Sequence, residues 1–319
     1  MDRRDFERAR LALFARHGFD GASRWTTGRT GRRTYAVEGG SGERPTILVH
    51  GGLSHAAEWA LVAGRLGGRL IIPDRPGCGL SYPIDYRGLD YRQEAADWLA
   101  EVVDGIGARE VDIVGNSMGG YFAVAFALAH PHRVRRLVLA GAPAGLDRDI
   151  PLFLRIWGHP ILGPVLAALG LTTPRDPEAL RRRVFSKLLV ADARRVPDEV
   201  LALTVAAAAM PGAARAAHTM LRAVLTMRGW RPELSIRDDL ARLETPALLV
   251  WGDADAFARP ESGAEVARRM PNGRLHVIRD AGHLPYLDQP DVVADAVAGF
   301  LGASDARADA VSVSGVSAR

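Results

Sequence analysis

The chain has 319 residues, which is enough for one large domain or two, and it is 48% hydrophobic and 24% charged. These fractions are close to those of soluble globular proteins and exclude a chain that is disordered over most of its length. No run of about 18 uncharged apolar residues predicts a transmembrane helix, and no apolar stretch near the N-terminus resembles a secretory signal. The single cysteine, Cys78, has no partner for an internal disulfide, so we expect a cytoplasmic protein without a membrane partner.

The formal net charge is only +4, although 41 residues are Lys or Arg. The arginines are scattered along the chain, and their densest run, at 181–183, is typical of a solvated helix face rather than of a basic patch. We therefore expect no nucleic-acid partner. No cluster of metal ligands is evident either, so we expect no metal and no cofactor.

Short apolar runs alternate with helical patterns along most of the chain. An amphipathic helix at 3–17, either packed on the body or a mobile arm, and a hairpin at 24–38 come first. The predicted buried strands then fall at 46–50, 70–73, 111–114, 134–140, 247–251 and 275–278. The predicted helices between and after them fall at 56–66, 91–106, 118–130, 260–270 and 291–301. This rhythm predicts an α/β fold with a doubly wound, mostly parallel sheet and helices on both faces.

The rhythm breaks between 143 and 242, where the sequence is rich in Ala and Leu, is punctuated by prolines and holds no convincing strand. We interpret this stretch as an inserted helical lid of about four helices. The core domain then comprises 1–142 and 243–302, and the small, polar tail at 303–319 is expected to be disordered. The apolar side chains of the lid are expected mainly to pack with one another; they include Phe153, Ile156, Trp157, Ile161, Leu162, Val165, Leu166 and Leu169.

The run GNSMG at 115–119 is the only G-x-S-x-G in the chain, and it stands directly after a predicted strand and directly before a predicted helix. In that position the chain must turn sharply, and flanking glycines avoid the clashes that a Cβ would cause. The turn exposes the Ser117 hydroxyl at the carboxyl edge of the sheet, where the helix N-terminus adds positive potential for an oxyanion. Ser117 is therefore the candidate nucleophile.

A serine nucleophile needs a base, and the base needs an anion that fixes its tautomer. His283 follows the last predicted strand, at the same sheet edge as Ser117, and is the candidate base. The run WGDAD at 251–255 offers two carboxylates after another strand. We favour Asp255 over Asp253 because it reaches farther from the strand end, and Asp147 is a third choice.

The run HGGL at 50–53 follows the first buried strand and forms a glycine-rich turn. Such a turn directs backbone N–H groups at a developing oxyanion, so we expect the N–H groups of Gly52 and Met118 to form the oxyanion hole. His50 is expected to be a structural residue beneath this turn.

These motifs, in the order Ser117, Asp255, His283, resemble those of the α/β-hydrolase family. The run DRPGCGLS at 74–81 also resembles a D-x-x-G-x-G-x-S segment of that family, in which Cys78 takes a variable place and is read as a packing residue. The resemblance covers roughly residues 32–301 and implies the α/β-hydrolase fold. Related haloalkane dehalogenases and epoxide hydrolases carry Asp at the nucleophile position, so a serine there implies acyl chemistry.

The chain is therefore expected to be an enzyme, a serine hydrolase of the carboxylic ester type. It would cleave an ester, thioester or lactone of a hydrophobic small molecule through an acyl-enzyme on Ser117. A helical lid over a serine site encloses an apolar pocket, and we expect Leu53, Trp157 and Leu284 to contact the substrate. The sequence does not indicate the oligomeric state.

Two alternatives remain open. The elbow GNSMGG also resembles that of meta-cleavage-product hydrolases, which cleave C–C bonds. Those enzymes carry Trp after the base histidine and an Arg in the lid, whereas this chain has Leu284 and no Arg at 200–204. The second alternative is a non-hydrolytic member of the fold that binds or cyclises a ligand.

Overall fold

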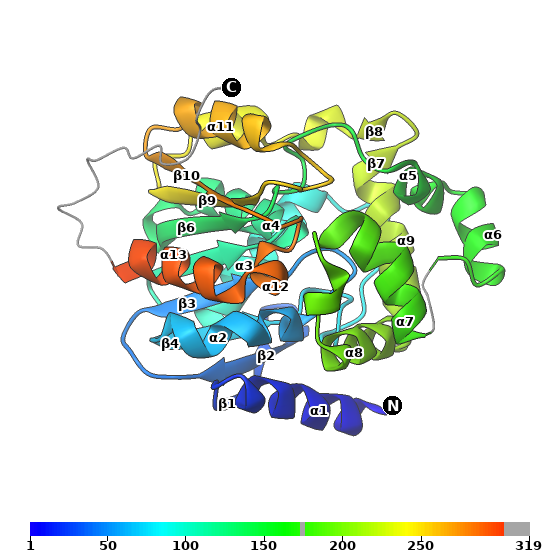
Figure 1. Cartoon of the computed structure of the whole chain (residues 1–319), viewed down its shortest axis with the longest axis horizontal. Coiled ribbons are helices and arrows are strands. Elements are labelled where there is room, and N and C mark those ends of the chain that lie inside the picture. Colours follow the sequence, from blue (N-terminus) through cyan, green and yellow to red (C-terminus); the bar gives the residue numbers. More distant parts are fainter. Residues whose placement is uncertain (173–175, 303–319) are drawn as a thin grey trace.

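The computed structural model describes residues 1–172 and 176–302, and within them an eight-stranded sheet runs between two layers of helices (Figure 1). The strands are β1 (Gly21–Thr27), β2 (Arg33–Gly39), β3 (Pro45–Val49), β4 (Arg69–Pro73), β5 (Val111–Gly115), β6 (Val134–Ala140), β9 (Ala247–Gly252) and β10 (Gly273–Ile278). Their order is β1-β2-β4-β3-β5-β6-β9-β10, and only the pairs β1–β2 and β2–β4 are antiparallel. The predicted doubly wound, mostly parallel sheet and the N-terminal hairpin are confirmed.

The central strands are mostly apolar because both faces of the sheet are covered. In β3, the side chains of Ile47 and Val49 join one hydrophobic core, and the side chain of Leu48 joins the core on the opposite face. The helices on the face of Ile47 are α3 (Tyr91–Gly105), α4 (Met118–Ala129) and α11 (Pro260–Arg269). Those on the face of Leu48 are α1 (Arg3–Arg16), α2 (Ala60–Leu66), α12 (Pro285–Asp288) and α13 (Pro290–Gly302).

The N-terminal helix α1 is packed on the body and is not a free arm. Arg10 on this helix forms a fully buried ion pair with Asp74, with 2.6 Å between Nη1 and Oδ2. Asp74 also accepts hydrogen bonds from the backbone N–H groups of Ala56 and Leu80. Burial alone would raise the pKa of this carboxyl, but the Arg10 charge and these bonds hold the pKa below its usual value. Asp74 thus ties α1 to the turns that follow β3 and β4.

The segment between β6 and β9 is mostly helical and lies at the right of Figure 1, beside the sheet. Its elements are α5 (Leu152–Gly158), α6 (Leu162–Ala168), α7 (Pro177–Leu180), a π-helix (Arg181–Leu189), α8 (Asp198–Ala208), α9 (Ala213–Val224), β7 (Leu225–Thr226), β8 (Gly229–Trp230) and α10 (Arg237–Ala241). The expectation of no strand here was wrong, since β7 and β8 pair antiparallel. The predicted tail at 303–319 lies outside the described residues.

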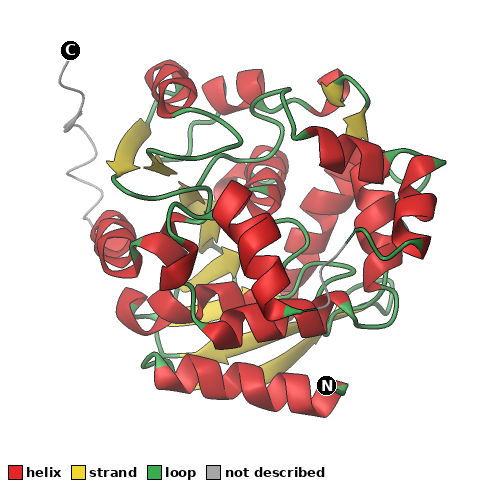
Figure 2. Cartoon of the chain, turned by 45° about the vertical axis from the view of Figure 1, so that its right-hand side comes forward, coloured by secondary structure: helices red, strands yellow, loops and turns green. Residues whose placement is uncertain are grey.

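The expected packing of the apolar set in this segment is only partly observed. Trp157 is buried, but a run of large apolar side chains on α5 and α6 is exposed; it comprises Phe153, Ile161, Leu162, Val165 and Leu169. α6 packs against α5 and α9 and lies at the right-hand edge of the molecule in Figure 1. Figure 2, in which this side comes forward, shows that it is built mostly of helices. Within residues 1–172 and 176–302 no single helix is long and apolar enough to span a membrane. The bent pair α8 and α9 meets that criterion by length and composition alone.

Candidate active site

Ser117 lies in the sharp turn between β5 and α4, with a backbone φ of 50° in the left-handed region. Such a conformation is strained for a residue other than glycine. The flanking glycines permit it because the chain closes tightly around the turn. A Cβ on Gly119 would stand 2.1 Å from the Val49 carbonyl oxygen, and a Cβ on Gly115 would stand 2.7 Å from the Gly119 carbonyl oxygen. The G-x-S-x-G spacing therefore follows from backbone contacts at this turn.

His283 and Asp255 meet at the carboxyl edge of the sheet, as their positions after β10 and β9 predict. His283 Nδ1 lies 3.0 Å from each carboxylate oxygen of Asp255, so this nitrogen carries the proton and donates it. The backbone N–H groups of Ala142 and Phe257 each donate a 2.9 Å hydrogen bond to the same carboxylate. Burial raises the pKa of Asp255, but its interactions with His283 and the two N–H groups outweigh this and lower it. Asp255 is thus a charged, fixed partner, and His283 Nε2 stays free of it.

The two other carboxylates considered from the sequence lie elsewhere. Asp253 is exposed, and its Oδ1 accepts a 3.3 Å hydrogen bond from the backbone N–H of Ala281, as a turn residue does. Asp147 pairs with Arg237. The structure brings Asp255, and neither of these, into contact with the imidazole.

Gly52 and Met118 are neighbours beside Ser117. A Cβ on Gly52 would lie 3.0 Å from Met118 Cγ, and all three residues line the same cavity. Within the described residues, no hydrogen-bond acceptor is found for the N–H group of Gly52 or for that of Met118. Both donors are therefore available to an oxygen atom bound next to Ser117.

His50 lies under this turn and is inaccessible to solvent. Its Nδ1 donates to the Gly51 carbonyl at 2.9 Å, and its Nε2 accepts the Arg75 backbone N–H at 2.9 Å. Burial and the Arg75 charge keep its pKa well below the usual value, so the ring is neutral. This is the structural arrangement expected for His50.

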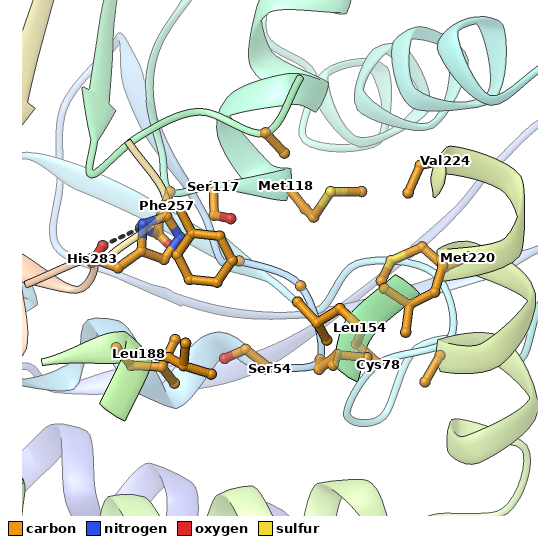
Figure 3. A pocket seen from close by; sticks show the side chains of 18 of the residues that line it. Ser54, Cys78, Ser117, Met118, Leu154, Leu188, Met220, Val224, Phe257 and His283 are labelled. Atoms are coloured by element: carbon orange, nitrogen blue, oxygen red, sulfur yellow. Dashed lines mark hydrogen bonds between the residues drawn. The ribbon is translucent and has the colours of Figure 1, made fainter. Parts of the chain in front are cut away.

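The cavity next to Ser117 and His283 has a volume of about 220 Å³ (Figure 3). Apolar side chains from the segment between β6 and β9 form much of its wall, including Leu154, Leu188, Met220 and Val224. The three residues expected to contact substrate, Leu53, Trp157 and Leu284, all line it as well. None of the described lining residues is Lys or Arg, and the acidic ones are Glu58 and Asp147. The described lining is therefore mostly apolar and contains no Lys or Arg.

Sequence reasoning missed several residues of this site. The Phe257 ring packs on the His283 ring with 4.2 Å between centroids. The Asn116 side-chain amide donates to the carbonyl oxygens of Ala140, at 2.6 Å, and His283, at 3.1 Å, which ties the elbow to the histidine loop. Asn116 stands at a variable position of the G-x-S-x-G motif, and Phe257 stands two residues after Asp255. In the sequence, only their nearness to these motifs could have indicated a place in the site.

Comparison with known proteins identifies the family of the chain. Residues 46–296 match the profile of the Alpha/beta hydrolase family. The chain belongs to this family and is a hydrolase.

Individual relatives divide between two activities. A 2-hydroxy-6-oxononadienedioate/2-hydroxy-6-oxononatrienedioate hydrolase from Burkholderia vietnamiensis is 31% identical over 259 residues, which are 79% of this chain and 84% of that protein. The crystal structure of carboxylesterase CesB from Bacillus subtilis matches with a TM-score of 0.72 at 21% identity, over 94% of this chain and 98% of that one. A meta-cleavage product hydrolase from Pseudomonas fluorescens matches with a TM-score of 0.68 at 24% identity, over 87% and 97%. The two structural matches establish the fold alone.

Proposed function

We propose that this hydrolase cleaves a carboxylic ester, or a thioester or lactone, of a hydrophobic small molecule through an acyl-enzyme on Ser117. The observation that carries the proposal is the apolar cavity at Ser117, whose described lining holds no Lys or Arg. The Burkholderia relative is named for a dienedioate, which is a dicarboxylate. Transfer of two carboxylates into an apolar cavity that already holds Glu58 costs several kcal/mol when no cation balances them.

In the proposed mechanism the Ser117 hydroxyl attacks the substrate carbonyl while His283 Nε2 takes its proton. Asp255 stabilises the imidazolium through the Nδ1 hydrogen bonds. The N–H groups of Gly52 and Met118 bind the oxyanion, and His283 then protonates the leaving group. Water activated by His283 finally releases the acid and restores Ser117. Among the described residues no hydrogen bond is found between Ser117 and His283, and catalytic hydrogen bonds often tighten only when a substrate is aligned.

C–C bond hydrolysis of the meta-cleavage-product type is the second candidate. The name and 31% identity of the Burkholderia relative support it, as does the elbow sequence at 115–120. Against it stand Leu284 after the histidine and the absence of Arg at 200–204. The charge of the preferred substrate distinguishes the two candidates.

The proposal is tested by the initial rates of wild type and Ser117→Ala on two sets of substrates. One set is p-nitrophenyl esters of increasing acyl length, and the other is 2-hydroxy-6-oxononadienedioate. We expect ester turnover that the substitution lowers to below a few per cent, and little turnover of the dienedioate. Faster turnover of the dienedioate than of every ester contradicts the proposal in favour of C–C cleavage. Absence of turnover on both sets, with thermal stabilisation by an ester, indicates a binding or cyclising protein.

A further inference from the structure

Two polar side chains in the cavity wall have no part in the proposed mechanism. Ser54 and Glu58 lie on the turn after β3 and on the short 3₁₀ helix Ala56–Trp59 that follows it. Both line the cavity, although they are only 7% and 3% exposed to solvent. Figure 3 shows Ser54 across the cavity from Ser117 and Met118. Ser54 and Glu58 thus place a hydroxyl and a carboxyl in the wall of a mostly apolar cavity, apart from the nucleophile.

The Ser54 hydroxyl makes no hydrogen bond of standard geometry. Its Oγ is fully buried and has no such partner within the described part of the chain, although it lies near enough to the Glu58 carboxyl to lower the pKa of that group. A buried hydroxyl without a partner costs free energy, and native structures seldom leave one without a bound ligand or water. This hydroxyl therefore points to a polar group that enters the cavity with a ligand.

The Glu58 carboxyl has spare capacity to accept hydrogen bonds. Tyr286 donates one bond to Oε2, at 3.2 Å. A carboxylate has about four acceptor positions, and Glu58 forms no ion pair with the described residues. The nearby Arg75 guanidinium instead donates to the carbonyl oxygens of His50 and Gly51. This carboxylate therefore has acceptor positions open to a donor from a ligand.

Several groups near Glu58 act on its pKa. Burial raises the pKa of Glu58 to about 7, while the Ser54 and Tyr286 hydroxyls and the charges of His283 and Arg75 act in the opposite direction. The carboxyl therefore titrates in the neutral range, where it can accept from a donor as the carboxylate or donate as the acid.

We propose that Ser54 and Glu58 form a subsite that binds a hydroxyl or ammonium group of the substrate. The preferred substrate is then a hydrophobic ester that carries one such donor away from the scissile bond. This inference rests on the proposed ester hydrolysis and adds the chemistry of the part of the substrate that does not react. The subsite also gives a physical reason why the described lining contains no Lys or Arg, because the subsite binds a donor and repels a carboxylate.

Matched esters test the subsite on both sides of the scissile bond. The acyl set is p-nitrophenyl hexanoate, 6-hydroxyhexanoate and 6-aminohexanoate, and the alcohol set is hexyl acetate and 6-hydroxyhexyl acetate. We expect wild type to prefer a donor-bearing ester over its unsubstituted partner by about tenfold in kcat/KM in at least one set, as one charge-assisted hydrogen bond allows. Glu58→Gln and Ser54→Ala should each reduce this ratio at least threefold.

A matched control separates recognition from packing. Glu94 also accepts a tyrosine hydroxyl, from Tyr82 at 3.3 Å, but it does not line the cavity. Glu94→Gln should therefore leave the ratio unchanged. The pH dependence distinguishes the two donors, because a preference for the ammonium ester should rise from pH 6 to pH 8 as Glu58 ionises, whereas a preference for the hydroxyl ester should change little.

Two kinetic results overturn the proposal. One is a wild-type ratio near one in both sets, and the other is a ratio that neither Glu58→Gln nor Ser54→Ala changes while the melting temperature falls, which assigns both residues to structure. Ligand binding to Ser117→Ala tests the subsite without turnover, so failure of ester hydrolysis is distinguished from failure of the subsite. There, 1,6-hexanediol should stabilise the protein more than 1-hexanol does, and this difference should vanish in Ser117→Ala with Glu58→Gln. Equal stabilisation by the two alcohols also refutes the subsite.

Discussion

Replacement of Asp255 by Asn tests the electrostatic part of the proposed mechanism. Its carboxylate accepts four hydrogen bonds, two from His283 Nδ1 and one each from the N–H groups of Ala142 and Phe257. An Asn side chain has almost the same shape but only one acceptor oxygen. Whichever oxygen the amide NH₂ replaces, it then faces one of the two backbone N–H donors and also the protonated Nδ1, and the negative charge next to the imidazole is lost.

The magnitude follows from the 3.0 Å separation of Nδ1 and the carboxylate oxygens. At an effective dielectric constant of about 20, opposite unit charges at this distance attract by about 5.5 kcal/mol. The attraction acts on the imidazolium that forms as His283 takes the serine proton, so it lowers the barrier of the chemical step. Since about 1.36 kcal/mol corresponds to tenfold in rate, Asp255→Asn should lower kcat by about 10⁴-fold.

The assay is kcat on the best p-nitrophenyl ester, with circular dichroism to verify that the variant is folded. Asp253→Asn is the matched control, because Asp253 is exposed two residues earlier and should change kcat by less than about threefold. A folded Asp255→Asn protein that loses less than about tenfold refutes the reasoning. The reverse ranking of the two variants would transfer the role of the anion to Asp253.

Two stability predictions concern groups away from the reacting atoms. Arg10→Met leaves Asp74 as an unpaired buried charge and should lower the free energy of unfolding, measured in urea, by about 3–5 kcal/mol. Arg8 is exposed, so the control Arg8→Met should lower it by less than about 1 kcal/mol. Equal losses in the two variants contradict a packed α1. Glu58 has a pKa of about 7 in the folded protein against 4.5 as a free side chain, so the folded state binds more protons and the wild type loses stability as pH rises through this window. The free energy of unfolding of Glu58→Gln minus that of wild type should therefore increase between pH 4.5 and 7, to about 3 kcal/mol. A difference that does not vary with pH contradicts the burial of this carboxyl.

The fold and the positions of Ser117, Asp255 and His283 could be predicted because short-range rules govern them. Strands such as β3 and β5 are buried at every position, and two-sided burial makes them mostly apolar. Parallel strands bring their carboxyl ends to one edge, so residues that directly follow β5, β9 and β10 meet there although they are far apart in sequence. The left-handed conformation at Ser117 and its close backbone contacts explain the flanking glycines.

Long-range packing determines what the sequence did not reveal. The attachment of α1 depends on the pairing of Arg10 with Asp74, 64 residues away, and no local pattern indicates that pairing. The exposed side of α6 follows from how three helices pack, whereas its composition resembles that of a buried helix. Nothing in the sequence around Glu58 indicates that its carboxyl is buried. The structure shows this through the contact of Glu58, on the 3₁₀ helix Ala56–Trp59, with Tyr286, 228 residues away.

This difference in range explains why likeness to relatives predicts the nucleophile better than the substrate. The elbow is fixed by contacts of Gly115 and Gly119 with neighbouring backbone, so a change in the helices over the cavity leaves it intact. Charge in the cavity depends instead on single side chains from the turn after β3 and from the segment between β6 and β9, which can change without disturbing the sheet. A chain 31% identical to a dienedioate hydrolase can therefore keep the catalytic geometry while a carboxyl at Glu58 opposes an anionic substrate. The substrate is better sought from the polarity of the cavity than from the names of the relatives.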